Sequence, residues 1–431
     1  MRRLPGDSAS AYHLPMDALA LYPFRGLRFV NERVDDPAVV ISPPYDMIDL
    51  IQAHRLAKSD SHNIVRLILP ELDEPDPRLR YRRAARTLAE WRAEGALQLD
   101  DEPALYVYEQ DGPLGLQRGL MGALQLPADD TGPVLPHEDV VDAVVADRRA
   151  LMYATGSNPE PILLTYQGGG PASELVERVA AQPDAIVDVH TADGTRHRLW
   201  AVTDPAEHAL VAEDLAGRQS LIADGHHRYA AYRRLAELRH PGTDRGLALL
   251  VDTSAHPLHV KGIHRWLPEL AAEQAIEAAG KWFTVEEVSG GYQAALTALA
   301  EVGPEQIALA VVDGSNRAWL LTDPNPELLA ETIPADRPES WRRLDATVLH
   351  YALAGEVWKI PDTADNIRFD HDARHAVIEA HRHKGLAVLV RPVAEATVME
   401  LAGAGVRMPR KSTAFTPKPA TGLVLRLFGE A

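Results

Sequence analysis

The sequence predicts an α+β fold, with mixed sheets that contain hairpins and with helices that flank them. Strand-like runs joined by Asp-Gly turns alternate with helical periodicities, and the two patterns lack the regular spacing of βαβ units. The sequence contains neither a dinucleotide fingerprint (GxGxxG after a strand) nor a P-loop (GxxxxGK followed by Ser or Thr). These observations favour α+β over a doubly wound parallel sheet.

Each expected element rests on a local pattern. Apolar residues at helical spacing predict helices over residues 78–97, 142–154, 226–239, 344–358 and 371–383. Apolar or β-branched runs predict strands over residues 104–109, 115–126, 161–166, 185–190, 196–203, 220–224, 247–252, 258–266, 307–312, 318–322, 386–392 and 422–428. The run 39–41 is also strand-like, and Pro43 and Pro44 stop it because proline cannot donate to a sheet.

Four regions are expected along the chain. They are an N-terminal extension (1–20), an N-terminal α+β region (21–170), a central α+β region with the sequence DGHHR (171–330) and a C-terminal α/β region that closes the site (331–431).

The composition excludes several classes of protein. The chain has no cysteine, which rules out disulfides, zinc-thiolate sites and a thiol nucleophile, and makes the cytoplasm the expected location. The net charge of −18 argues against nucleic acid as a partner. No apolar run long enough for a membrane span and no signal-like block is found, so we expect no membrane partner. The oligomeric state is not fixed by these patterns.

The segment Asp224–Arg228 carries the strongest chemical signal. A strand enters a helix through Gly225, and the start of a helix attracts anions through its backbone N–H groups. His226 and His227 are suited to proton transfer or to nucleophilic attack on phosphorus. The alternative is that Asp224 caps the helix, Gly225 is a turn residue and the histidines face solvent.

Several motifs in a fixed order resemble a known family. They are PPYD at 43–46, HED at 137–139, DR at 147–148, IADGHHRY at 222–229, IHR at 263–265, LD to LH at 344–350, and MPRKST to PKP at 408–419. Over nearly the whole chain, this set resembles domain of unknown function family 1015. Many members carry Lys-Glu shortly before the Asp-Arg, where this chain has Val145-Ala146, so no role of that dipeptide is carried over.

The DGHHR segment is also similar to the signature loop of the ParB and sulfiredoxin-like superfamily, which includes nucleotide-binding partition proteins, sulfiredoxin and kinases of free serine. In those relatives a strand-loop-helix element holds phosphates. The resemblance therefore implies such an element in this chain. Relatives of the present family are often associated with serine biosynthesis, which implies a small phosphorylated amino acid as substrate.

The other candidate residues have structural alternatives. Glu138 and Asp139 offer hard oxygen ligands that suit Mg²⁺, unless Asp139 caps a helix and Glu138 is solvated. Tyr45 and Asp46 orient a ligand, or Asp46 caps the following helix. Lys411, Ser412 and Lys418 form a phosphate clamp on a Pro-stiffened stretch, or belong to a loop that closes over the core. His264 and Arg265 end a strand, where they can reach a ligand or lie on the surface.

The preferred hypothesis is a phosphoryl-transfer enzyme for a small phosphorylated metabolite, a phosphatase or phosphotransferase for phosphoserine or a similar compound. The substrate or its phosphate would be bound by Tyr45, Asp46, Gly225, Arg228, His264, Arg265, Lys411, Ser412 and Lys418. His226 or His227 would be the nucleophile or general acid/base and Asp224 would orient it. Glu138, with Asp139 or Asp147, would hold Mg²⁺ or activate water.

Two alternatives remain open. A nucleotide-dependent small-molecule kinase would use nearly the same residues and bind ATP or ADP. A non-catalytic ParB-like module would bind nucleotide or DNA and would need a basic face, which the net charge of −18 does not favour.

Overall fold

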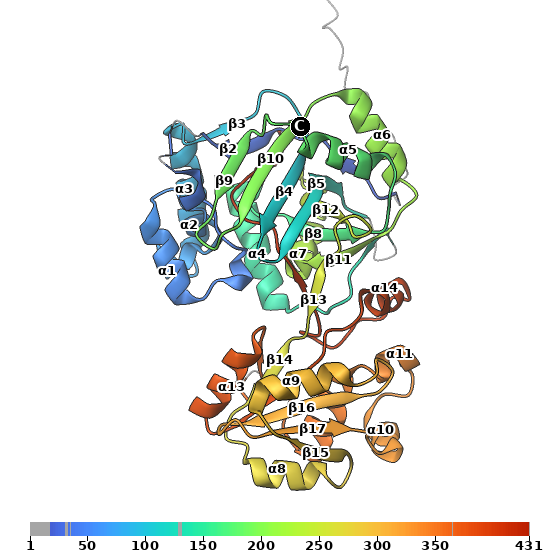
Figure 1. Cartoon of the computed structure of the whole chain (residues 1–431). Helices are drawn as coiled ribbons and strands as arrows, with labels where there is room; N and C mark the ends of the chain where they lie inside the picture. Colours follow the sequence, from blue (N-terminus) through green and yellow to red (C-terminus); the bar gives the residue numbers. More distant parts are fainter. Residues whose placement is uncertain (1–17, 31–32, 35, 128–131, 364, 431) are drawn as a thin grey trace, which may run out of the picture. The chain divides into compact units, whose positions relative to one another are not determined.

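The computed structural model describes residues 18–30, 33–34, 36–127, 132–363 and 365–430, which form two compact units (Figure 1). The first unit takes its residues from Met1–Pro136, Val140–Leu258 and Pro417–Ala431, and the second from His137–Asp139 and His259–Thr416. Of the expected extension over residues 1–20, all but 18–20 lies outside the described residues. The division into regions at 170/171 and 330/331 stays a prediction.

The centre of the first unit is a large mixed sheet. Its strands, in spatial order, are β6 (Val134–Leu135), β11 (Ser220–Asp224), β8 (Ile162–Tyr166), β12 (Arg245–Asp252), β5 (Gly115–Gln125), β4 (Leu105–Gly112), β10 (Arg196–Val202) and β9 (Val187–His190), with β1 (Leu21–Tyr22) beside β5. The pairs β6/β11 and β8/β12 are parallel and the other pairs are antiparallel. Parallel and antiparallel pairs in one sheet confirm the predicted α+β class.

A smaller antiparallel sheet brings distant segments of the first unit together. It contains β3 (Leu97–Leu99), β2 (Gly26–Phe29), β21 (Leu425–Leu427) and β7 (Ser157–Asn158). Because β21 pairs with both β2 and β7, the segment after residue 417 is an integral part of this unit. Its backbone returns beside the beginning of the unit, and Ser42 pairs with Thr421 in an isolated bridge.

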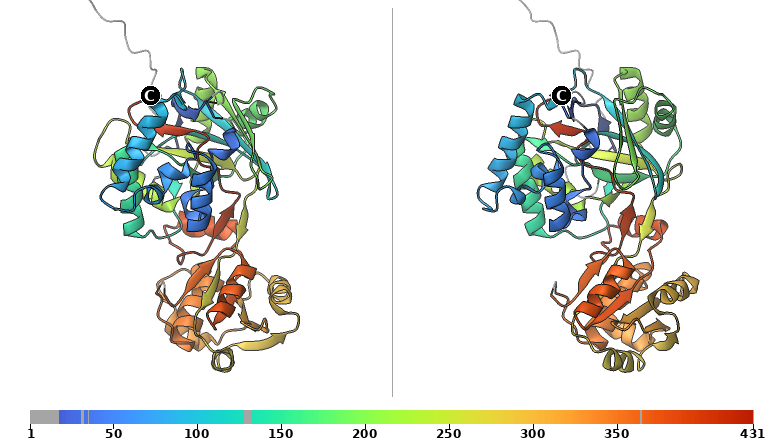
Figure 2. Two further views of the ribbon diagram at one scale, coloured as in Figure 1. Left: turned by 90° about the vertical axis from the view of Figure 1, so that its left-hand side faces the viewer. Right: turned by 60° about the vertical axis from the view of Figure 1, so that its left-hand side comes forward.

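Helices supply the remaining core of the first unit. They are α1 (Leu50–Ser59), α2 (Val65–Ile68), α3 (Arg80–Ala93), α4 (Asp142–Thr155), α5 (Pro171–Ala180), α6 (Pro205–Leu215) and α7 (His226–Ala236), with short 3-10 turns η1 (Pro37–Val39), η2 (Tyr45–Met47) and η3 (Pro70–Leu72). The core joins apolar side chains of α4, α5, α6 and α7 to those of the large sheet. Helices α3 and α4 contact one another and can be followed as blue and teal ribbons in Figure 2.

The second unit has an antiparallel sheet of its own. Its strands are β15 (Thr284–Val288), β17 (Ala318–Thr322), β16 (Ala308–Asp313), β19 (Leu386–Leu389), β14 (His264–Leu267) and β18 (Arg368–Asp370), and a separate pair consists of β13 (His259–Lys261) and β20 (Ala414–Thr416). The helices are α8 (Ala272–Ala279), α9 (Gly291–Glu301), α10 (Pro326–Thr332), α11 (Glu339–Arg342), α12 (Asp345–Thr347), α13 (Ala373–Arg382) and α14 (Glu395–Gly403). Alanines and valines of α9, α13 and the sheet form one core cluster.

Three local expectations are wrong, each for a physical reason. Residues 39–41 do not form a strand, because Val39 ends the turn η1, which Pro37 starts and in which Asp36 accepts a hydrogen bond from Ala38 N. The expected strand 258–266 is split into β13 and β14 at Gly262, where a Cβ would lie 2.2 Å from the carbonyl oxygen of Val390. The expected helix 344–358 is α12 followed by a π-helix (η4, Val348–Val357).

Within the described residues, no helix is both long and apolar enough to span a membrane.

Candidate functional site

The DGHHR segment forms the strand-loop-helix element that its sequence predicts. Strand β11 ends at Asp224 and helix α7 begins at His226, with Gly225 between them in the left-handed region at φ 92°. A Cβ at Gly225 would lie 2.9 Å from Ile162 Cγ2 and 3.1 Å from Arg228 Nε. Both the backbone angle and the close packing therefore require glycine at this turn.

Asp224 lies at the centre of a buried charge cluster, which we call the Lys418 cluster. Its Oδ2 atom accepts a hydrogen bond from an Arg228 guanidinium nitrogen at 2.5 Å, and its Oδ1 atom lies 2.5 Å from Lys418 Nζ. Lys418 Nζ also donates to Asp46 Oδ2 at 3.4 Å. The ammonium thus bridges two carboxylates that are far apart in the sequence, and its side chain is only 11% exposed.

The charges of this cluster reinforce one another. Burial acts to lower the pKa of Lys418, but Asp224 and Asp46 outweigh it and the pKa is raised. The same holds for Arg228, where Asp224 and Glu160 outweigh burial. Arg228 is 1% exposed and also donates to the carbonyl oxygen of Pro161, while its Nε atom has no hydrogen-bond partner in the described residues.

A second layer of contacts fixes the turn η2 that carries Asp46. The buried Glu160 accepts a hydrogen bond from Tyr45 N at 3.0 Å, and the ring of Tyr45 stacks under the Arg148 guanidinium with 4.3 Å from Cζ to the ring centroid. Arg148 donates to Asp147 Oδ2, with distances of 2.9 Å from Nε and 2.5 Å from a terminal nitrogen. These contacts place Asp46 beside Lys418.

The pKa values of the two carboxyl groups near Arg148, those of Glu160 and Asp147, are shifted in opposite directions. Burial raises the pKa of Glu160, although Arg228 and Arg148 act against it. For Asp147 burial also acts upward, but Arg148 and a hydrogen bond from Tyr81 outweigh it and lower the pKa. Asp147 is therefore a structural partner of Arg148 in the described contacts.

The two histidines of the motif occupy different surroundings. His227 Nε2 accepts a hydrogen bond from Val141 N at 3.0 Å, so this imidazole satisfies the backbone at the start of helix α4. His226 is the first residue of α7 and is buried, with 9% of its surface exposed. Asp224 bonds to Arg228 and Lys418, and its contact with a histidine stays a prediction.

The capping alternatives for three acidic residues are wrong. Helix α7 has Gly225 at its N-cap position with no side-chain bond, so Asp224 does not cap it. Asp49 caps α1, which leaves Asp46 inside the turn η2. Helix α4 begins after Val141 and has no side-chain cap, so Asp139 does not cap it either.

In the second unit, Glu138 lies beside the stretch 411–413. Thr413 Oγ1 donates to Glu138 Oε1 at 3.3 Å and is itself 2.8 Å from His137 Nε2. Burial raises the pKa of Glu138, against Lys411 and the backbone N–H groups of Thr413 and Ser412. Lys411 holds a left-handed backbone at φ 57°, which a non-glycine residue rarely adopts.

Arg265 of the second unit is buried without an ion pair among the described residues. Its guanidinium donates to His350 Nε2 at 3.3 and 3.4 Å and to the carbonyl oxygen of Ile263, and it lies 5.0 Å from the centroid of Phe369. Burial lowers the pKa of Arg265 to about 10, although Glu138 and Asp362 act against it. Its neighbour His264 accepts a hydrogen bond from Val390 N at 3.2 Å.

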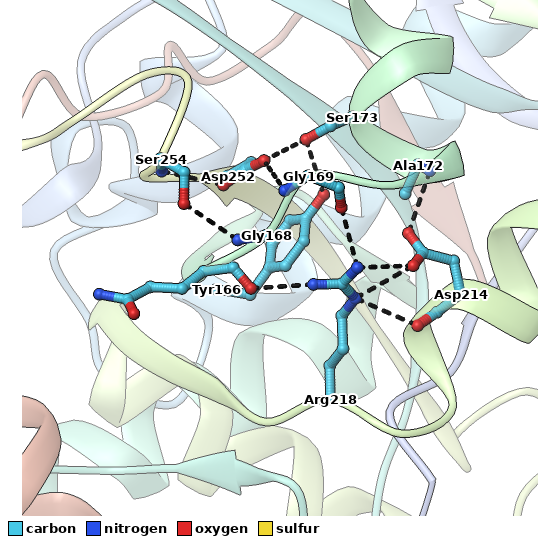
Figure 3. A network of polar contacts seen from close by, with 10 residues as sticks. Tyr166, Gly168, Gly169, Ala172, Ser173, Asp214, Arg218, Asp252 and Ser254 are labelled. Atoms are coloured by element: carbon cyan, nitrogen blue, oxygen red, sulfur yellow. Dashed lines mark hydrogen bonds and ion pairs between the residues drawn. The ribbon is translucent and has the colours of Figure 1, made fainter.

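The glycine-rich loop at 168–170 is a third place where backbone N–H groups converge, between β8 and α5 (Figure 3). Gly168 N donates to Ser254 Oγ at 3.1 Å and Gly169 N to Asp252 Oδ2 at 2.9 Å. Arg218 bonds to Asp214 and to the carbonyl oxygens of Gln167 and Gly169. Because side chains of the first unit already satisfy these groups, the loop is a packed connection.

The predicted Mg²⁺ ligands Glu138 and Asp139 are neighbours in the chain with different surroundings. Glu138 is half-buried against the Thr413 donor, whereas Asp139 is exposed. Among the residues that the structure describes, no three His, Asp or Glu side chains form a group that could hold a metal ion. Mg²⁺ at Glu138 and Asp139 therefore stays a prediction.

The structure thus divides the predicted site residues between the two units. The first unit holds Tyr45, Asp46, Asp147, Asp224, Gly225, His226, His227, Arg228 and Lys418, and the second holds Glu138, Asp139, His264, Arg265, Lys411 and Ser412. Sequence reasoning missed Glu160 and Arg148 as parts of the site, and did not pair Arg265 with His350. A buried carboxylate such as Glu160 gives no periodic or motif signal of its own.

Fold and site together define an α+β protein with an extensively paired charge cluster at a strand-to-helix turn. The chain belongs to the family described as protein of unknown function (DUF1015), whose model matches residues 21–347. This confirms the resemblance inferred from the motifs. A search of curated proteins finds no match to this sequence.

Among solved structures, a free serine kinase in complex with AMP matches at 15% identity and a TM-score of 0.35, over 72% of this chain and 92% of the other. A mutant of a free serine kinase in complex with ADP matches at 14% identity and a TM-score of 0.37, with the same coverage. SbnI from Staphylococcus aureus, with a C-terminal truncation, matches at 10% identity and a TM-score of 0.34, over 72% and 87%. TM-scores this low carry no functional argument for this chain.

Proposed function

We propose that the Lys418 cluster is the centre of a phosphoryl-transfer site for a small phosphorylated metabolite, with phosphoserine as the first candidate. The observation that carries the proposal is the position of Lys418 Nζ, 2.5 Å from Asp224 and 3.4 Å from Asp46, beside the start of helix α7. A lysine ammonium is a compact point charge on a flexible stem, and a phosphate can attract it.

The chemistry of phosphoryl transfer needs a cation for the charge on the transferred group and a group that moves a proton. Lys418 supplies the cation, and the N-terminal end of α7 adds a favourable partial charge. Asp46, whose side chain is 29% exposed, is the carboxylate that a substrate hydroxyl or a water molecule reaches. In this proposal Asp46 acts as the general base when phosphate binds to Lys418.

His226 or His227 is the imidazole for proton transfer or nucleophilic attack in this proposal, and the Nε2 atom of His227 also accepts a hydrogen bond from Val141 N. Arg228 is deeply buried and holds Asp224 in place, so its role in the proposal is to position the cluster. Glu160 and Arg148 hold the turn of Asp46 from the other side.

The test is a panel of phosphorylated metabolites that begins with phosphoserine, assayed with and without Mg²⁺ and with serine plus ATP or ADP. Lys418→Met is expected to lower kcat/KM about 100-fold or more, the size found when one charge-stabilising donor is removed. Lys58→Met is the matched control, because Lys58 is an exposed lysine of α1 outside the cluster, and it is expected to keep full activity.

The reaction products distinguish a phosphatase from a kinase. Release of inorganic phosphate identifies a phosphatase, and transfer between nucleotide and serine identifies a kinase. A Lys418→Met variant with unchanged turnover, or a wild type that shifts duplex DNA at physiological salt and turns over no metabolite, would contradict the proposal.

A further inference from the structure

The second unit contains a wide groove of about 1010 Å³ that the proposed reaction does not use. Its walls come from β13 and the residues after it, from α9, from α11 and from the segment 390–400. All of its lining residues belong to the second unit. The volume is in the range of pockets that enclose small organic molecules.

His264 lines this groove with a defined tautomer. His264 is buried, with 8% of its surface exposed. Its Nδ1 atom accepts a hydrogen bond from Val390 N at 3.2 Å. The proton of the neutral ring must then lie on Nε2, which bonds to no described residue. Burial, followed by Arg265, lowers the pKa of His264 to about 4, so the ring is neutral at physiological pH. It offers one N–H donor to a ligand.

Lys261 adds a positive charge at the edge of the same groove. It is exposed, and it forms no ion pair with a described residue. The two arginines of the lining are already bonded. Arg391 is paired with Asp345 at 2.7 and 2.9 Å, and Arg343 lies 3.9 Å from Glu339 and donates to the carbonyl oxygen of Glu305. The His264 N–H donor and the Lys261 ammonium, which has no ion pair, are groups that would bind the two oxygens of one carboxylate.

The rest of the lining restricts the ligand further. Leu296, Leu299, Leu344 and Val390 form an apolar wall. The groove is also lined by Glu305, Glu339 and Glu400, and these carboxylates disfavour a ligand with several negative charges. A nucleoside triphosphate is therefore a poor fit, whereas a molecule with one anionic end and an apolar body matches both halves of the groove.

We propose that the groove binds a small monocarboxylic acid with an aliphatic or aromatic body, whose carboxylate meets His264 Nε2 and Lys261 Nζ. The site is separate from the Lys418 cluster and complete within the second unit, so it does not depend on the proposed phosphoryl chemistry.

The test uses the fluorescent probe 8-anilinonaphthalene-1-sulfonate, which has one anionic group on an aromatic body, titrated into the full-length protein. We expect saturable binding that octanoate displaces, that octanol displaces at least about tenfold less well, and that ATP does not displace. Lys261→Met should weaken binding about threefold, as for a single exposed charge, whereas the matched Lys281→Met should not change it.

A groove-filling pair makes the test specific to this site. Ala300→Trp places a large ring in the groove from an exposed position of α9, and Thr297→Trp places the same ring on an exposed position of that helix outside the lining. Binding should fall at least about tenfold in the first variant only. Equal binding in both variants, an absence of saturable binding, or displacement by ATP as good as by octanoate would overturn the proposal. Circular dichroism verifies that both variants are folded.

Discussion

Arg228 in the first unit and Arg265 in the second are both 1% exposed, yet their charges are compensated in different ways. Arg228 bonds to the Asp224 carboxylate, and its pKa is raised. Arg265 bonds to the neutral ring of His350 and a backbone carbonyl, stacks near Phe369, and has its pKa lowered to about 10 by burial. The comparison shows that one chain buries guanidinium groups both with and without a bonded carboxylate. Burial prevails over the nearby charges only at Arg265, where the pKa is lowered.

The largest expected effect comes from the carboxylate of the first unit. Asp224→Asn leaves Arg228 and Lys418 buried without their shared partner, and we expect the free energy of unfolding to fall by about 3–5 kcal/mol. Urea unfolding followed by circular dichroism measures it. Asp188→Asn is the control, since Asp188 and Arg196 form an exposed pair of the same 2.5 Å length, and its effect should be close to experimental scatter. Equal losses in both variants would break the comparison.

The next effect is a pH dependence in the second unit. Burial lowers the pKa of His350 from 6.5 to about 4 in the folded state, with Arg265 acting in the same direction. A histidine with a depressed folded pKa contributes stability that is present above 6.5 and is lost as the pH falls from 6.5 towards 4. His350→Gln should therefore lose less stability than the wild type between these two pH values. Parallel profiles in urea unfolding at several pH values would contradict this.

Removing the Arg265 guanidinium should lower the free energy of unfolding less than removing the Asp224 carboxylate that compensates Arg228. Arg265→Met deletes a buried charge that leaves no carboxylate partner behind in the described contacts, and we expect a loss of less than about 2 kcal/mol in the free energy of unfolding. The measurement is again urea unfolding. A loss as large as that of Asp224→Asn would show that a charge partner compensates Arg265 after all.

The smallest effects concern the aromatic rings that face each kind of arginine. Tyr45→Leu and Phe369→Leu remove rings whose centroids lie 4.3 Å from Arg148 Cζ and 5.0 Å from Arg265 Cζ. Each should lower the free energy of unfolding by about 1 kcal/mol through the lost cation–π contact. We expect the Phe369 variant to lose more, because Arg265 has fewer other partners. The reverse order in thermal unfolding would contradict that ranking.

The sequence predicted the elements better than the contacts. The β4/β5 hairpin, the strand β11 and the helix α7 follow from periodicity and turn residues, which act locally. The bridge from Lys418 to Asp224 joins residues that no local pattern connects, although the Pro-stiffened stretch around Lys418 marked this lysine as a candidate. The role of His227 at the start of α4 likewise depends on tertiary packing that a sequence motif does not encode.

The errors have the same origin. Alternating residues over 258–266 predicted one strand, but the close approach of Gly262 to Val390 divides it between two pairings. Three capping assignments were reasonable from sequence, and all three failed because the helices begin two to four residues later than the acidic residue. Helix boundaries are the part of a helix that its periodicity determines least.

Lys418 is synthesised near the end of the chain, and this late position affects how the first unit can fold. Asp46 and Asp224 leave the ribosome long before Lys418, which follows the last residue of the second unit, Thr416, by only two positions. Until then the first unit lacks both the ammonium that its carboxylates share and the strand β21 of its smaller sheet. The nascent first unit therefore stays incomplete while almost all of the second unit is synthesised. The two units therefore cannot fold to completion one after the other in the order of synthesis.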